Sequence, residues 1–135
     1  MKDSISIAVD EFSTPVLVSG DKGDSIRSIE EKMNEHGVRH IPILDEGRPV
    51  GIISDRDIHL LCEIEKENKL IASDIMVNEP FCVSLGTPLD EVAFQMSQKK
   101  IGSALVVDGE SKLDSIFTSV DGLNALIEVI RGDID

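Results

Sequence analysis

Residues 33–45 read MNEHGVRHIPILD and residues 96–108 read MSQKKIGSALVVD, so one pattern returns after 63 positions (33 to 96). The stretch GIISDRD at 51–57 then matches SIFTSVD at 115–121, a shift of 64 (51 to 115). A period of this length in a chain of 135 residues leaves room for two copies and little else. Such a repeat indicates two similar units that bury faces on each other, and we expect function on the surfaces that the pair creates.

Charge and hydropathy exclude two classes of partner. The formal net charge is −13, from 26 acidic and 13 basic residues, and the bases form no stripe that could follow a phosphate backbone. No apolar stretch is long enough to cross a bilayer, and the first ten residues contain no apolar signal segment. The sequence therefore predicts a cytoplasmic protein that binds neither nucleic acid nor membrane.

Each copy is predicted to form strand, helix, two strands and a second helix, which indicates the α/β (α+β) class. In the first copy a strand is expected at Val16–Val18, and the helix after it is expected to be capped by Asp24 and to end at Gly37. In the second copy Thr87 is the expected cap. The paired strands are predicted at 41–44 with 50–54 and at 103–107 with 113–118, and the closing helices at 55–67 and 120–131. This organisation gives domains at 7–67 and 77–131, joined by a linker at 68–76.

The residues GVRHIPILD at 37–45, Gly47 and GIISDRDI at 51–58 resemble the signature of a cystathionine-β-synthase (CBS) domain. The segment ASDIM at 72–76 resembles the one that leads into a second copy, so the chain is similar to a stand-alone tandem pair, a Bateman module. The second copy departs from the pattern where Ser115 replaces Gly51 and where Gly102-Ser103 replaces Arg39-His40. The resemblance implies two β-α-β-β-α repeats packed through their sheets with pseudo-twofold symmetry, and two equivalent clefts between them.

In this family the clefts bind adenosyl ligands (AMP, ADP, ATP or S-adenosylmethionine), and many such modules modulate another protein. The resemblance thus implies a regulatory ligand-sensing module that requires no cofactor and acts on an unidentified target. It also implies a homodimer formed through the closing helices. The expected seam consists of the exposed parts of Ile58, Leu61, Leu123 and Ile127.

Two carboxylates stand at the start of the predicted closing helices. Asp57 and Asp121 can each accept hydrogen bonds from both hydroxyls of a ribose. The hydroxyls of Ser54 and Thr118, together with free helix N–H groups, can hold a phosphate. The same Ser/Thr-x-x-Asp pattern is also close to a capping box, which only satisfies the helix start, and the pattern alone does not separate these readings.

The first copy carries more candidate phosphate ligands than the second. Arg39 and His40 open its second strand, and Arg56 stands beside Asp57. We therefore expect the Asp57 cleft to bind phosphate better than the Asp121 cleft. By analogy with the family, the adenine pockets would be lined by Phe81 and Ile101 in the first cleft and by Val16 and Val38 in the second.

No catalytic or metal site is predicted. His36 and His40 are four residues apart, but Gly37 and Pro42 break the helix that would align them as metal ligands. No Ser/His/Asp or Cys/His set has the spacing of a nucleophilic centre. The alternative to a ligand sensor is therefore a ligand-free dimerisation or assembly module, and an enzyme is not expected.

Overall fold

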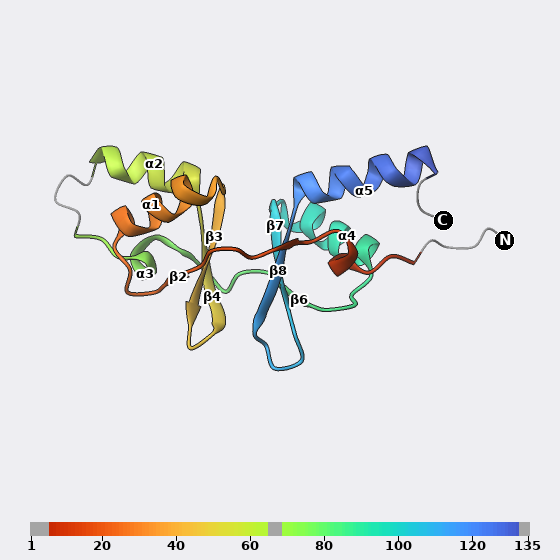
Figure 1. Ribbon diagram of the computed structural model, residues 1–135, viewed down its shortest axis with the longest axis horizontal. Helices are drawn as coiled ribbons and strands as arrows, with labels where there is room; N and C mark the ends of the chain where they lie inside the picture. Colours follow the sequence, from red (N-terminus) through yellow and green to blue (C-terminus); the bar gives the residue numbers. More distant parts are fainter. Residues whose placement is uncertain (1–5, 65–68, 133–135) are drawn as a thin grey trace. The chain divides into compact units, whose positions relative to one another are not determined.

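The structure is a computed structural model that describes residues 6–64 and 69–132. The chain forms two compact units, each with one four-stranded sheet and its own helices (Figure 1). The first-repeat unit contains the described residues of 16–80, and the second-repeat unit contains residues 6–15 and 81–132. The predicted α/β class and the two repeats are confirmed.

The first-repeat unit has a sheet in the order β2-β3-β4-β5. Strand β2 pairs in parallel with β3, and the other two pairs are antiparallel. The core consists of isoleucines from α1 and the two long strands, with Met33, Ile58 and Ala72. The bounds are β2 (Gly20–Asp21), α1 (Ile26–His36), β3 (His40–Asp45), β4 (Arg48–Ser54), α2 (Asp55–Ile64), α3 (Ala72–Ile75) and β5 (Val77–Asn78).

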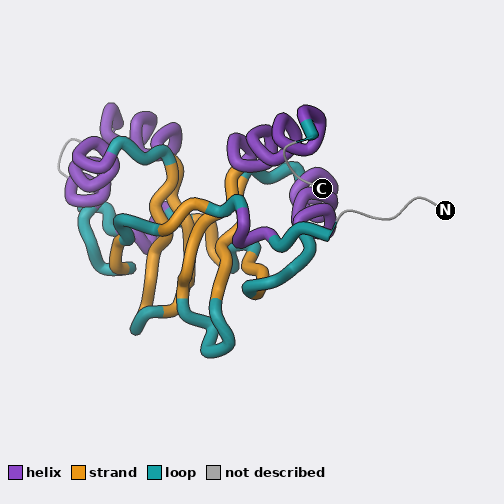
Figure 2. The backbone as a smooth tube through the Cα atoms, turned by 45° about the vertical axis from the view of Figure 1, so that its right-hand side comes forward, coloured by secondary structure: helices purple, strands orange, loops and turns teal. Residues whose placement is uncertain are grey.

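The second-repeat unit has the matching order β1-β8-β7-β6, again with one parallel pair, β6 with β7. Phe117 on β8 is the largest fully buried side chain, and it packs with Val92 and Met96 of α4. The bounds are η1 (Val9–Glu11), β1 (Thr14–Pro15), β6 (Cys82–Ser84), α4 (Leu89–Lys99), β7 (Ser103–Val107), β8 (Leu113–Thr118) and α5 (Ser119–Arg131). Strand β8 is followed directly by α5, and Figure 2 shows strands in orange that run straight into helices in purple.

Helix α1 illustrates how local sequence sets an element. Ile26, Ile29 and Met33 recur at helical spacing and are all buried, and Gly37 ends the helix in the left-handed conformation (φ 64°). The cap, however, is Ser25, whose Oγ accepts a hydrogen bond from the N–H of Ser28. The predicted cap Asp24 was wrong because its carboxylate accepts from the N–H of Asp21 and from Lys32 instead.

The predicted cap of α4 was wrong for a similar reason. The Thr87 hydroxyl donates to the carbonyl oxygen of Ser84, 2.7 Å away, so it does not serve the helix. Pro88 takes the N-cap position without a side-chain hydrogen bond. Local turns compete for short polar side chains, and the spacing in the sequence does not show which partner wins.

The strand predicted at Val16–Val18 is not formed. Thr14 and Pro15 form β1, which pairs antiparallel with β8 in the second-repeat unit. The chain then enters the first-repeat unit, where β2 at Gly20–Asp21 pairs with β3. Residues 16–18 belong to neither strand because they connect strands of two different sheets.

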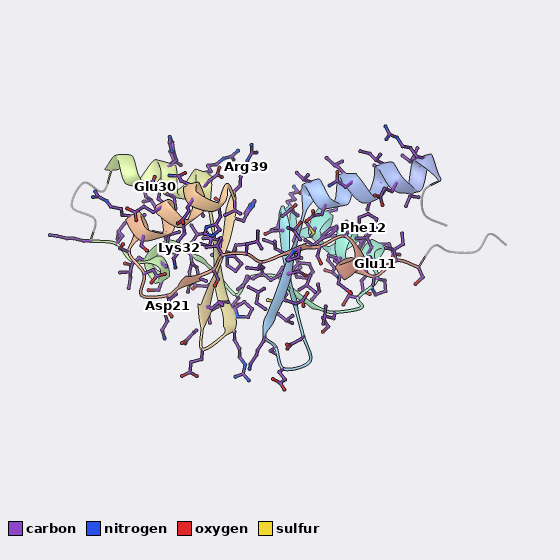
Figure 3. All side chains as sticks on the ribbon, in the orientation of Figure 1. Glu11, Phe12, Asp21, Glu30, Lys32 and Arg39 are labelled. Carbon is purple, nitrogen blue, oxygen red and sulfur yellow. The ribbon has the colours of Figure 1, made fainter. Side chains whose placement is uncertain are left out.

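The opening segment of each copy pairs with the other copy's strands. The segment before Val16 packs with the second-repeat unit, where Val9 is fully buried and Phe12 lies against the core (Figure 3). Strand β5, at the start of the second copy, pairs with β4. The domain limits 7–67 and 77–131 therefore stay a prediction for the sequence repeats, while the compact units are discontinuous in sequence. Residues 65–68, at the predicted end of the first domain and the start of the linker, lie outside the described residues.

Candidate functional site

Both units place the candidate residues where a long strand turns directly into a helix. Strand β4 ends at Ser54 and α2 begins at Asp55, and β8 ends at Thr118 and α5 begins at Ser119. Each helix start is held by a backbone hydrogen bond to the residue before the neighbouring strand. The N–H of Asp55 donates to the Arg39 carbonyl (2.8 Å), and the N–H of Ser119 donates to that of Gly102 (3.1 Å).

In the second-repeat unit, Asp121 is engaged within the protein. The residue is only 8% exposed. The carboxylate accepts hydrogen bonds from the Thr118 N–H (2.9 Å), from the Thr118 hydroxyl (3.2 Å) and from the Thr14 hydroxyl (3.0 Å). Thr118 and Asp121 thus form a complete capping box, the structural reading of the motif.

In the first-repeat unit, Asp57 has surroundings that differ from those of Asp121. Its N–H donates to the Ser54 hydroxyl at 3.3 Å, which satisfies one donor of the helix start. Within residues 6–64 and 69–132, however, its half-buried carboxylate has no hydrogen-bond or ion-pair partner. The same sequence motif therefore has an open carboxylate at Asp57, which means one without a protein donor in the described residues. At Asp121 the carboxylate is closed, which means that protein donors already occupy it.

Two of the predicted phosphate ligands lie together. Arg39 and Arg56 both line a depression of about 760 Å³ between α1 and α2, and Val38 lines it with them. Arg39 follows the end of α1 and precedes β3 (Figure 3). Glu30 and Asp55 also line this depression, whereas Asp57, Ser54 and His40 do not. The arginines and the ribose candidate thus occupy neighbouring but distinct surfaces of the first-repeat unit.

His40 is paired directly with Ser54 across the β3–β4 ladder. Burial lowers the pKa of His40 below its ordinary value of 6.5, and the nearby charge of Arg39 lowers it further. The carboxylates of Asp55 and Asp57 act in the opposite direction without overcoming the burial. At neutral pH the ring is therefore a neutral hydrogen-bonding group beside the helix start.

This shift predicts a pH dependence of stability. The unfolded chain takes up a proton at His40 more readily than the folded chain, so stability is fully present above pH 6.5 and is lost as pH falls towards the folded pKa. Urea unfolding at pH 7.5 and 5.5 is expected to show a loss at the lower pH that His40→Asn reduces. His59→Asn, at an exposed position on α2, is the control and keeps the wild-type difference. An unchanged pH difference in His40→Asn would contradict the prediction.

The predicted adenine-pocket residues are divided between the units. Val16 and Val38 lie in the first-repeat unit and are half-buried. Phe81 and Ile101 lie in the second-repeat unit, where Phe81 packs against the core and the Lys99 ammonium stands 5.7 Å from the centre of its ring. Ile101 is 37% exposed. Their role in an adenine pocket stays a prediction.

Sequence reasoning identified the replacement of Gly51 by Ser115 but missed Ser13 and Thr14, the residues that contact the second motif. Ser115 replaces Gly51, and its hydroxyl donates to that of Ser13 at 2.7 Å. At Gly51 an added Cβ would collide with the Met76 side chain. Ser13 and Thr14 lie outside the matched stretches of the repeat, so only the pairing of β1 with β8 reveals their place beside Ser115 and Asp121.

Neither a metal site nor a membrane-spanning helix is found in the part of the chain that the structure describes. No group of three His, Cys, Asp or Glu side chains there is placed to hold a metal ion. No helix among the same residues has the length and apolar character needed to span a membrane.

Known proteins match this chain over almost its whole length. A family model described as CBS domain matches residues 9–61 and 72–128. The L-aspartate semialdehyde sulfurtransferase of Methanocaldococcus jannaschii is 32% identical over 122 residues, which cover 90% of this chain and 23% of that protein. Uncharacterized protein MK0525 of Methanopyrus kandleri is 30% identical over 119 residues, which cover 86% and 61%. The chain thus spans less than two thirds of either relative's length.

Two solved structures with bound small molecules are similar throughout. CBSX2 of Arabidopsis thaliana has a crystal structure in complex with AMP, with a TM-score of 0.76, 27% identity, and coverage of 90% of this chain and 97% of that one. The CBS domain pair of MJ0100, in complex with 5-methylthioadenosine and S-adenosyl-L-methionine, has a TM-score of 0.78, 28% identity, and coverage of 89% and 99%.

Proposed function

The chain belongs to the CBS domain family, and on that premise we propose that it is a regulatory module that binds an adenosyl ligand and modulates a partner protein. Adenosyl compounds are bound by CBSX2 and by the MJ0100 domain pair, which supports this ligand class. The ligand is bound and released unchanged, so its effect on the partner depends on a difference in affinity between two states of the module.

The observation that carries this proposal is the open carboxylate of Asp57. The Asp57 carboxylate is half-buried and has no hydrogen-bond or ion-pair partner among the described residues, so it is available to accept two charge-assisted hydrogen bonds from a ribose diol. Asp57 stands at the start of α2, beside the Ser54 hydroxyl. The proposed ligand therefore places its ribose on Asp57.

The remaining candidates of the first-repeat unit carry groups suited to a phosphate or a carboxylate. We propose that Ser54, His40 and the helix start bind the group attached to the ribose, with His40 acting as a neutral donor. Arg39 and Arg56 supply positive charge from the adjacent depression. Thr118 and Asp121 form the corresponding second site, which the capping box and Thr14 occupy in this structure.

Isothermal titration of nucleotide-stripped protein with AMP, ADP, ATP and S-adenosylmethionine tests the proposal. Saturable binding of at least one of them, with the ligand recovered unaltered, supports an adenosyl sensor. Folded protein that binds none of them would contradict it, and both Asp motifs would then be helix caps.

The proposed dimer uses the outer face of α5. Val120, Leu123, Ile127 and Ile130 are all exposed and recur three or four residues apart, the spacing of helices that pair along a seam. Because the stripe is continuous along one helix, we propose that a second copy of the chain covers it. Ile58, predicted in the seam, is only 2% exposed and belongs to the core of its own unit, so that part of the prediction was wrong. Sedimentation at several protein concentrations tests the dimer.

This exposed stripe also favours the second candidate function, a ligand-free assembly module. The closed state of Asp121 agrees with it, because there the motif acts as a cap. The two functions differ at Asp57, because a sensor needs its carboxylate to bind ribose and an assembly module does not. A dimer that forms without binding any adenosyl ligand would favour assembly over sensing.

A further inference from the structure

We infer that Thr14 is an intramolecular occupant of the Asp121 site and that it makes the two ligand sites unequal. The Thr14 hydroxyl donates to Oδ1 of Asp121 at 3.0 Å, while Oδ2 accepts both hydrogen bonds from Thr118. This inference rests on the proposed function and specifies which of its two sites takes the ligand first.

The number of acceptor positions explains why Thr14 matters. A carboxylate offers about four lone-pair positions at which it can accept a hydrogen bond. At Asp121, hydrogen bonds from Thr14 and Thr118 already occupy three of these positions. A ribose diol needs two acceptor positions, so it must displace a protein donor before both of its hydroxyls can bind. Thr118 is part of the helix cap, which leaves Thr14 as the donor that can be displaced without opening the capping box.

Thr14 is held in place by the fold. It lies on β1, opposite Ile116 of β8, and the adjacent Ser13 is hydrogen-bonded to Ser115. Upstream on the same segment, Val9 is fully buried in the core of the unit. A donor fixed in this way loses little further freedom when it binds Asp121, so it competes effectively with a free ligand.

Among the described residues of the first-repeat unit, no side chain donates to the Asp57 carboxylate in this way. Val77 lies opposite Ile52 in the register of β5 with β4, and Ile52 is the repeat equivalent of Ile116 (52 + 64). Val77 is therefore the counterpart of Thr14, with the same branched shape and a methyl group in place of the hydroxyl. The neighbouring pair agrees with this alignment, because Met76 against Gly51 corresponds to Ser13 against Ser115.

Two reciprocal substitutions of nearly equal shape test the inference. Thr14→Val removes the internal donor, and Val77→Thr places a hydroxyl at the equivalent position beside β4. Both side chains are exposed at the edge of their sheets, so neither change disturbs a core. Each variant is titrated with the adenosyl compound that the wild type binds most tightly, and Thr14→Val is also examined in an Asp57→Asn background.

The wild type is expected to bind about one equivalent of ligand per chain, and Thr14→Val to bind a second. In the Asp57→Asn background, Thr14→Val is expected to raise the affinity about tenfold, as removal of one competing hydrogen bond to a charged group predicts. Val77→Thr is expected to weaken binding by a similar factor. A second measurement needs no ligand. Thr14→Val is expected to lower the Tm of the wild type, and to lower it less in the Asp121→Asn background, where the carboxylate that accepts the hydrogen bond is already altered.

The outcomes separate this inference from the proposed function. Wild-type binding with an unchanged titration in Thr14→Val and Val77→Thr would overturn the role of Thr14 and leave the sensor standing. Equal Tm losses for Thr14→Val in the wild-type and Asp121→Asn backgrounds would also count against it. Absence of binding in both the wild type and Thr14→Val would overturn the proposed function, and this inference with it.

Discussion

Asp57→Asn is expected to weaken binding of the adenosyl ligand about 100-fold, because hydrogen bonds to a charged acceptor contribute about 1.5–3 kcal/mol each. The amide keeps the shape of the side chain but replaces one acceptor oxygen by a donor, so only one ribose hydroxyl retains its partner. The carboxylate has no partner in the described residues, so the substitution breaks no contact that the folded chain makes there. Isothermal titration measures the loss, and urea unfolding verifies that stability is retained.

Asp121→Asn is the matched control for this loss. It alters the same motif in the other unit, where the carboxylate is closed by Thr14 and Thr118. We expect it to keep most of the wild-type affinity and to lose some stability, since it disturbs a helix cap. Loss of binding in Asp121→Asn with retention in Asp57→Asn would reverse the assignment of the two sites.

Phe117→Ala is expected to lower the free energy of unfolding by about 3–5 kcal/mol, the usual cost of truncating a buried phenylalanine. Phe117 is 1% exposed and packs in one core cluster with Val9, Val92 and Met96. Helix α5 also rests on it, since a Cβ on Gly122 would stand 3.5 Å from the ring. Such a loss is a large share of the stability of an ordinary domain. Urea unfolding followed by circular dichroism measures it.

The same substitution at an exposed position serves as the control. Phe94 on α4 is 61% exposed, so Phe94→Ala creates no cavity and is expected to change stability by less than about 0.5 kcal/mol. Equal losses in Phe117→Ala and Phe94→Ala would show that the core described for the second-repeat unit is not the one that stabilises it.

Local sequence was sufficient for most secondary elements. The helix that carries Ile26, Ile29 and Met33 could be located because buried residues three and four apart repeat along one face, and Gly37 allows the left-handed turn that ends it. The strands around Ile41 and Ile53, and the corresponding strands of the second copy, could be located by their β-branched residues and the turns between them. These signals depend on neighbours within a few residues, so they can be read directly from the chain.

The state of the candidate site could not be predicted in this way. Ser54-x-x-Asp57 and Thr118-x-x-Asp121 are equivalent in sequence, yet one carboxylate is open and the other is closed. Thr118 donates two of the hydrogen bonds that close the Asp121 carboxylate, and the third comes from Thr14, which is 107 residues away from Asp121. No spacing rule links two positions so far apart, because their contact requires β1 to pair with β8.

The sequence by itself thus determined the two repeats, their helices and long strands, and the four polar residues of the two helix-start motifs. Only the tertiary structure decided which sheet each opening segment joins and therefore which aspartate is occupied. The physical reason is that a two-residue edge strand such as β1 or β5 carries almost no periodic signal of its own. Its position is set by backbone hydrogen bonds to a strand distant in the chain, and that pairing brings Thr14 to one carboxylate and leaves Val77 in the equivalent place beside the other strand.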